Sequence, residues 1–417
     1  MSHSFPTRRS SDLLVLYLMA SNQHDQSKPA IYWIFFWASG VATLFVWNAV
    51  VSQTDYMKNR FRSDVDKIYP FYNFLGGLIA FFLYYKVFCR LKLKQRITLI
   101  PLVLVVISIA FYYVGEYAPK SSTKFSVLMA LCFADGFFSS IIQTSLIAYS
   151  FLFDHYEISY CSAGGALVAI FINLVSFANE YAFEHDRYDI KGLLYLAFQI
   201  TILSILMVVF GTFASRCPKD MSKADNLVPR PKKEILQAEE KRISMGKKGT
   251  PSLATTFKNI SSYFFNLVIT YTITLSVYPG FCLDLGLNWS SPAATQIILF
   301  VFNLFDCLGK WSYSLKKMPD NWIPQTLCLI RTIFVAVVVY IFGSNGHPEL
   351  IDKPWFTVLF TGLLGLSNGY LTAGLFSLSA ERSPPDQRDN AGFLMTLALS
   401  SGLCYGSLCT TISTTSA

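Results

Sequence analysis

Residues 297–310 read IILFVFNLFDCLGK, an apolar run that carries a carboxylate and an ammonium group one helical turn apart. A charged side chain near the middle of a bilayer costs roughly 2.5–3.5 kcal/mol on insertion scales. Asn303, Asp306 and Lys310 are spaced to project from one face of a helix, so this face cannot point at lipid. For this helix alone, two interpretations are open: a buried pair that holds two helices together, or the wall of a polar pathway.

The composition of the whole chain is that of a helical membrane protein. Of its 417 residues, 53% are hydrophobic and 14% are charged, whereas soluble domains carry about a quarter charged residues. The apolar blocks are long enough to cross roughly 30 Å of hydrocarbon, and they are continuous rather than alternating. The sequence therefore predicts an all-α polytopic membrane protein. Its eleven predicted spans cover residues 31–52, 70–89, 97–115, 125–150, 160–178, 192–214, 262–282, 295–315, 324–343, 355–377 and 391–412.

The distribution of Lys and Arg predicts the orientation of the chain. With a cytoplasmic N-terminus, the segments on that side carry 24 of the 34 basic residues and the opposite side carries 9, while Arg331 lies inside a span. Cytoplasmic loops are enriched in Lys and Arg, so we expect the N-terminus in the cytoplasm and, with an odd number of spans, the C-terminus outside. The net charge of +8 resides largely in residues 216–258 and indicates no nucleic-acid partner.

One polar segment divides the spans into six and five. Two bundles around a central cavity are the arrangement used by alternating-access transporters, and the predicted layout resembles the major facilitator type. The predicted parts are a cytoplasmic arm (1–30), a six-helix bundle (31–214), a cytoplasmic linker (215–260), a five-helix bundle (261–412) and an extracellular tail (413–417). Within the arm, residues 1–18 resemble the translation of a sequencing-library adapter, so we expect them to be an assembly artefact and Met19 to be the natural start.

Several other spans contain polar or helix-breaking residues. Trp47 lies in mid-span, where an indole either stacks on a planar ligand or packs within the bundle. Gln143 offers both donors and acceptors, as needed to read the edge of a nucleobase or a sugar. Asp135 is an intramembrane acid that either carries a proton or pairs with another polar residue. Pro279-Gly280 and Asn368-Gly369 interrupt their spans and are predicted hinge or packing positions.

Taken in series, four segments resemble the equilibrative nucleoside transporter family, also called solute carrier 29-like. Residues 302–310 look like its FNxxDxxGR signature, and residues 44–48 look like its first-span LLPWN. Residues 271–280 are similar to its TLSVFP segment, and residues 367–371 match its SNGYL. Eleven spans and a large loop after the sixth are also the family's layout, and a protist member is one possibility.

The resemblance implies a nucleoside site in a central cavity between the two bundles. Six side chains are implied to bind substrate: Leu44, Trp47, Gln143, Asn303, Asp306 and Lys310. The Leu and Trp enclose the base in the family, and the Gln contacts the base. The Asp and the basic residue contact the ribose hydroxyls and their surroundings, and Asn303 supports them. The chain departs from the pattern where Val46 replaces Pro and Lys310 replaces Arg, since an ammonium cannot make a planar bidentate contact.

The expected function is therefore transmembrane transport of nucleosides, with nucleobases as further candidates, by facilitative alternating access. A proton-coupled nucleoside symporter and a transporter of organic cations or monoamines on the same scaffold are the alternatives. We expect no enzyme, because no nucleophile–base pair or phosphate loop is present, and the nine cysteines have no metal spacing. The expectations also include no cofactor, no metal and no nucleic acid, with a nucleoside and the lipid bilayer as partners and the plasma membrane as the location. The oligomeric state is left open, with a monomer as one option.

Overall fold

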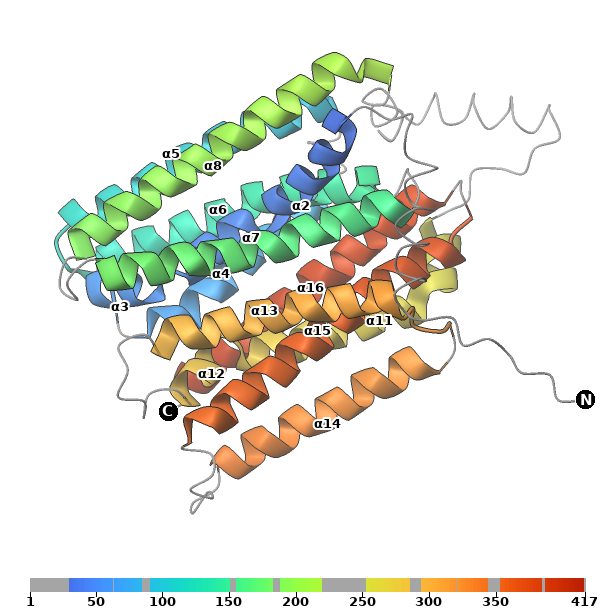
Figure 1. The fold of residues 1–417 in the computed structure, drawn as a ribbon. Helices are drawn as coiled ribbons and strands as arrows, with labels where there is room; N and C mark the ends of the chain where they lie inside the picture. The colour runs from blue at the N-terminus through green and yellow to red at the C-terminus, as the bar shows by residue number, and fades with distance from the viewer. Residues whose placement is uncertain are drawn as a thin grey trace, which may run out of the picture.

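The computed structural model is entirely helical in the part of the chain that it describes (Figure 1). It describes residues 30–62, 64–84, 91–150, 155–182, 188–219, 253–285, 294–320, 322–343, 353–384 and 387–415. The helices are α2 (Ala30–Val51), α3 (Thr54–Arg60), α4 (Val65–Tyr84), α5 (Leu93–Tyr117), α6 (Ser122–Ser150), α7 (His155–Ala182), α8 (Tyr188–Arg216), α11 (Leu253–Val277), α12 (Gly280–Leu285), α13 (Ala294–Leu315), α14 (Ile323–Gly343), α15 (Pro354–Arg382) and α16 (Arg388–Thr415).

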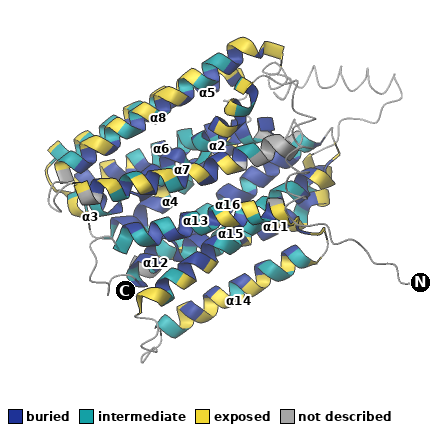
Figure 2. Ribbon diagram, in the orientation of Figure 1, coloured by how far each residue is buried: buried dark blue, intermediate teal, exposed yellow. Residues whose placement is uncertain are grey.

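Long helices overlie each predicted span, and eight described segments are long and apolar enough to cross a membrane. Helices α4, α7 and α13 fall outside that group. In α13 the cause is visible in the sequence, because Asn303, Asp306 and Lys310 interrupt the apolar run. Many large apolar side chains on the outer faces of α5, α8 and α14 are exposed, as expected for contact with lipid (Figure 2). The number of crossings and the six-plus-five division stay predictions.

The two halves of the chain each form a group of paired helices. In the N-terminal half α2 packs against α7, α4 against α6, and α5 against α8. In the C-terminal half α13 packs against α15, and α11 packs against α16. The halves meet where α16 contacts α4 and α6, and where α7 contacts α13 and α15. Helix α14 lies at one edge of the molecule and the α5–α8 pair at the opposite edge (Figure 1).

Glycines allow several of these helix pairs, among them α4–α6 and α13–α15, to approach backbone to backbone. A Cβ atom on Gly136 of α6 would lie 1.8 Å from the carbonyl oxygen of Asn73 on α4. A Cβ atom on Gly369 of α15 would lie 1.9 Å from the carbonyl oxygen of Asp306 on α13. Small residues at such crossings are how membrane helices pack closely in lipid. Gly369 was predicted as a hinge or packing position, and its contact with the Asp306 carbonyl oxygen is consistent with the packing role.

Polar bonds join the two halves at the end of the molecule that carries α3 and α12. Lys67 Nζ of α4 lies 2.8 Å from Asp284 Oδ2 of α12. The Thr411 hydroxyl of α16 donates to the Lys67 carbonyl oxygen at 2.9 Å. On the neighbouring helices, the Thr295 hydroxyl donates to Asp55 Oδ1 at 3.3 Å. The two halves are therefore held together at this end.

The helices extend beyond some of the predicted boundaries. Helix α11 begins at Leu253, within the predicted linker 215–260, and α16 continues to Thr415, within the predicted tail 413–417. The prediction counted only apolar residues, whereas a helix continues into polar sequence until its backbone is interrupted. The arm at residues 1–29 and the linker from residue 220 to 252 lie outside the described residues.

Candidate functional site

The six predicted substrate residues line one cavity between the two halves. Leu44, Trp47, Gln143, Asn303, Asp306 and Lys310 all border a cavity of about 130 Å³. This cavity adjoins a larger one of about 470 Å³, and Leu44, Gln143 and Lys310 border both. The larger cavity is of the size usual for small-molecule sites. Residues from spans far apart in the sequence therefore come together around one space.

The N-terminal wall of this space is formed by apolar, aromatic and amide groups. The Trp47 ring lies 4.4 Å from the ring of Phe74 and 5.9 Å from that of Tyr69, measured between centroids, so the indole is held by packing. Leu44 lies one turn before it on α2. The Gln143 side chain makes no hydrogen bond within the described residues and is partly exposed in the cavity. Its amide is therefore available to a ligand.

The C-terminal wall carries an ion pair. Lys310 Nζ lies 2.7 Å from Asp306 Oδ2, and only 11% and 12% of these two side chains are exposed. The pair forms because the two residues are four apart on α13, which places their side chains on one face. Asn303, one turn before Asp306, is buried at 9% exposure and makes no side-chain hydrogen bond in the part of the chain described. Three polar groups thus face the cavity from one helix.

Asn368 belongs to this wall, although the sequence indicated it only as a hinge or packing position. Its Nδ2 donates to Asp306 Oδ1 at 2.7 Å, so the carboxylate is held from two sides, by Lys310 and by Asn368. The Thr274 hydroxyl of α11 donates to Asn368 Oδ1 at 2.7 Å. Tyr271, on the same helix, borders both cavities. The polar interruption Ser367-Asn368 in an apolar run was the available signal for this residue.

The predicted interruption at Pro279-Gly280 separates two helices. Helix α11 ends at Val277, the Tyr278–Pro279 peptide bond is cis, and α12 begins at Gly280. A Cβ atom on Gly280 would lie 3.2 Å from Thr410 Cγ2, so this position packs tightly against α16. The interruption is a feature of the fold, and its use as a hinge stays a prediction.

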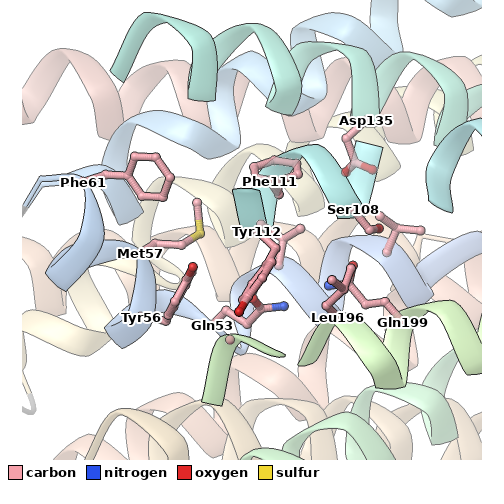
Figure 3. Close-up of a pocket in the computed structure, with 13 residues that line it drawn as sticks. Gln53, Tyr56, Met57, Phe61, Ser108, Phe111, Tyr112, Asp135, Leu196 and Gln199 are labelled. Atoms are coloured by element: carbon pink, nitrogen blue, oxygen red, sulfur yellow. The ribbon is translucent and has the colours of Figure 1, made fainter. Parts of the chain in front are cut away.

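Asp135 lies away from the six substrate residues, within the N-terminal half. It is 2% exposed, and Asn73 Nδ2 donates to its Oδ2 at 3.0 Å. Asp135 borders a separate cavity of about 30 Å³, which has room for a water but not for a nucleoside. Figure 3 shows Asp135 and Ser108 at one end of this cavity and Met57 and Phe61 toward the other. Asn73, in contrast, lines the 130 Å³ cavity, so the two residues connect the two spaces.

Within the described ranges, no group of three or more His, Cys, Asp or Glu side chains could hold a metal ion. The cysteines there are thiols, six of them buried, and Cys307 is half-buried beside Asp306. The polar chemistry of the central cavity is therefore that of amides, hydroxyls and one ion pair. Such groups can bind a neutral, hydroxyl-rich ligand by hydrogen bonds.

The sequence of this chain is similar to those of known transporters. Residues 128–413 match the family model described as nucleoside transporter. The chain is 23% identical over 389 residues to equilibrative nucleotide transporter 1 of Arabidopsis thaliana, covering 90% of this chain and 84% of that one. It is 31% identical over 170 residues to equilibrative nucleoside transporter 2 of Homo sapiens, covering 38% of this chain and 37% of that one.

Solved structures resemble the fold. The major facilitator superfamily proton:xylose symporter XylE, bound to 6-bromo-6-deoxy-D-glucose, superposes with a TM-score of 0.60 at 11% identity. That likeness covers 90% of this chain and 87% of the symporter. The arrangement of helices is therefore that of the major facilitator type.

Proposed function

The chain belongs to the nucleoside transporter family, and on this premise we propose how it carries nucleosides across the membrane. It is an integral membrane protein that transports nucleosides. In the proposed cycle a nucleoside binds in the cavity between the two halves, and the halves then rock about it so that the cavity opens to each side in turn. The observation that carries this proposal is the single cavity bordered by all six substrate residues.

The N-terminal wall binds the base. The Trp47 indole offers an aromatic face held in place by Phe74, and Leu44 covers the adjacent apolar surface. Aromatic and aliphatic contact supplies affinity for a planar base with little dependence on its identity. The unengaged amide of Gln143 supplies hydrogen bonds to the edge of the base, which adds selectivity.

The C-terminal wall binds the ribose. Asp306 accepts hydrogen bonds from ribose hydroxyls, while Lys310 and Asn303 complete the polar contacts around the sugar. A site of this kind rejects an analogue that lacks a hydroxyl, because a buried polar group is then left unpaired. Asp306 is the one carboxylate among the described lining residues of both cavities, and it is paired with Lys310. The cavity thus offers no surplus negative charge to an organic cation, which favours a neutral substrate.

Alternating access is supported by the contrast between the two ends of the molecule. The halves are joined at the α3 and α12 end, for example by the Lys67–Asp284 ion pair. The 470 Å³ cavity is bordered by residues toward the other end of the molecule, such as Ser150 at the end of α6 and Ser377 near the end of α15. With a cytoplasmic N-terminus, this cavity lies on the cytoplasmic side of the joined end, and we propose that it opens toward the cytoplasm. We also propose a plasma-membrane location.

Transport is proposed to be facilitative, and one residue provides a test of that point. Asp135 is buried, and Asn73, which donates a hydrogen bond to it, is neutral, so a proton-coupled cycle would use this carboxylate. Uptake of uridine is measured with and without an inward proton gradient, in wild type and in Asp135→Asn. Equal uptake under both conditions supports the facilitative cycle. Stimulation by the gradient that disappears in Asp135→Asn establishes coupling instead.

The experiment for the function itself uses cells that lack endogenous nucleoside transport. Wild type is expected to take up radiolabelled nucleosides, and Asp306→Ala is expected to abolish uptake while the protein remains in the membrane. Glu381→Ala is the matched control, because that carboxylate is on α15 with a 51% exposed side chain. Near-normal uptake by Asp306→Ala would defeat the assignment of the site.

A further inference from the structure

Arg331 is a buried cation that the substrate site does not include. It lies on α14, the helix at the edge of the C-terminal half, whose neighbouring side chains Leu329, Ile330 and Ile333 are exposed. Arg331 itself is 5% exposed, and no described carboxylate lies within ion-pair distance of it. A buried unpaired cation is costly, and intramembrane charges of this kind are usually functional. The position therefore calls for a reason beyond packing.

The Arg331 guanidinium is held by three short hydrogen bonds. Its Nε donates to Ser367 Oγ at 2.9 Å, and its Nη1 donates to the Thr270 carbonyl oxygen at 2.7 Å. Its Nη2 donates to Thr274 Oγ1 at 2.7 Å. Because Thr270 and Thr274 are on α11 and Ser367 is on α15, the planar fork of donors bridges the two helices that flank α14.

One of these bonds begins a continuous path to the cavity. Thr274 donates its hydroxyl hydrogen to Asn368 Oδ1 at 2.7 Å, and Asn368 Nδ2 donates to Asp306 Oδ1 at 2.7 Å. A carboxylate only accepts, so the amide of Asn368 must turn its Nδ2 toward Asp306 and its oxygen toward Thr274. Arg331 donates into the Thr274 oxygen, and the single Thr274 hydroxyl hydrogen has two acceptors at 2.7 Å, Asn368 Oδ1 and the Thr270 carbonyl oxygen. The Thr270 carbonyl oxygen already accepts from Arg331 Nη1, which favours the hydrogen bond to Asn368. With the hydroxyl hydrogen on Asn368, the hydrogen bonds run without a break from Arg331 to Asp306.

Asp306 lies between two cations at different distances. Asp306 has Lys310 at 2.7 Å on its cavity side and the Arg331 charge behind it, three hydrogen bonds away. In a low-dielectric interior, chains of hydrogen bonds polarise one another and carry such a charge further than in water. When a ligand hydroxyl takes a place on Asp306, the second cation and the oriented amide still hold the carboxylate.

We propose that Arg331 is a positioning residue for ribose recognition: acting through Thr274 and Asn368, it holds the Asp306 carboxylate in the orientation that binds the sugar hydroxyls. Arg331 does not touch the substrate. This inference rests on the proposed function, in which Asp306 binds the ribose. The same three hydrogen bonds would form if Arg331 only held α14 against α11 and α15. The test must therefore separate orientation of the Asp306 carboxylate from attachment of α14.

The test compares uptake of uridine with uptake of its 2′-deoxy and 3′-deoxy analogues, normalised to folded protein at the surface. Arg331→Met is expected to raise the apparent KM for uridine by roughly tenfold and to lower discrimination against one analogue by a similar factor, with maximal rate per transporter nearly unchanged. Arg331→Lys is expected to restore part of the discrimination, because the charge and one donor remain.

A matched control and a second variant keep the test decisive. Ser367→Ala removes the hydrogen bond that leads away from Asp306 and is expected to leave discrimination at the wild-type value. Thr274→Val breaks the path and leaves Arg331 in place, so it is expected to lower discrimination even if Arg331→Met does not fold. In an Asp306→Asn background, the Thr274→Val change is expected to have no further effect on discrimination.

Failure of the inference about Arg331 can be distinguished from failure of the proposed function. A fall in maximal rate with unchanged KM and discrimination in Arg331→Met and Thr274→Val would show that Arg331 only clamps the helices, which overturns the inference. Discrimination that persists in Asp306→Asn, or wild type that takes up no uridine, would overturn the proposed function whatever the Arg331 variants do.

Discussion

Helix pairs α4–α6 and α13–α15 carry the same polar joint with the Asp and the Asn exchanged. In the first pair, Asn73 of α4 donates to Asp135 of α6, and in the second, Asn368 of α15 donates to Asp306 of α13. The two partners are 62 residues apart in the sequence in both pairs. In each pair a glycine directly after the α6 or α15 residue lies against the carbonyl oxygen of the partner. The two halves therefore share one way of joining two helices.

The two joints differ in charge and in what they face. In the C-terminal joint, Lys310 lies four residues after Asp306 on α13, and its Nζ is 2.7 Å from the carboxylate. In the N-terminal joint, Asn73 of α4 takes the place of Asp306, and the residue four after it is the uncharged Gly77. Asp306 borders the central cavity, whereas Asp135 borders the small cavity inside the N-terminal half. The comparison separates two roles: close packing is common to both joints, and ligand recognition by a charged group belongs to the C-terminal one.

The largest expected effect tests the common role. Gly136→Leu and Gly369→Leu should each abolish folded protein, because their Cβ atoms would lie 1.8 and 1.9 Å from a carbonyl oxygen of the partner helix. The measurement is the monodisperse fraction in size-exclusion chromatography of detergent extracts. Gly211→Leu is the control, since a Cβ there meets nothing within 4 Å. Folding of either variant as good as that of the control contradicts the shared joint.

The next effect tests the difference. Asp306→Asn should lower the initial rate of nucleoside uptake on the order of 100-fold, because it leaves Lys310 without its counter-charge. Asp135→Asn should stay within about threefold of wild type, because an amide oxygen still accepts from Asn73. Rates are compared per surface-exposed transporter. Equal losses in the two variants would mean that the joints do not differ in role.

A smaller effect concerns the cation itself. Lys310→Arg should keep uptake within about threefold of wild type, because a guanidinium keeps the ion pair and adds a bidentate geometry. Lys310→Met should lower uptake by roughly tenfold, because Asp306 then loses its charge partner. Kinetic constants for uridine in both variants check this. Wild-type kinetics in Lys310→Met would remove Lys310 from the site.

The smallest effect lies on the opposite wall. Gln143→Ala should reduce discrimination between purine and pyrimidine nucleosides by about tenfold or less, with little change in maximal rate, because it removes hydrogen bonds and leaves the aromatic contacts of Trp47. Competition of labelled uridine uptake by a nucleoside panel measures this. Ser126→Ala, at an exposed position of α6, is the control. An unchanged competition profile in Gln143→Ala places base selectivity elsewhere.

The sequence predicted what depends on neighbours along the chain. Continuous apolar runs determine where the long helices lie, and the spacing of Asn303, Asp306 and Lys310 determines that they share a face. The likeness to family motifs was needed to add Leu44, Trp47 and Gln143 from other helices. Their positions on one cavity agree with that prediction, and their roles stay proposals.

The pairings between helices could not be predicted, because they depend on which helices are neighbours in space. Asp135 was singled out without its partner Asn73, and Asn368 was indicated as a hinge rather than as a partner of Asp306. Arg331 was noticed only as a basic residue inside a span, since its contacts come from α11 and α15. Hydrogen bonds across 62 residues of sequence leave no local pattern.

The central claim is that a nucleoside occupies the cavity beside Asp306, and Cys307 allows it to be tested directly. This half-buried thiol borders the 470 Å³ cavity next to the carboxylate. The measurement is the rate at which a methanethiosulfonate reagent modifies Cys307 in purified protein, followed by mass spectrometry of its peptide. Saturating uridine should slow modification in wild type and not in Asp306→Asn, with glucose as the control solute. Equal rates with and without uridine in wild type would contradict the claim.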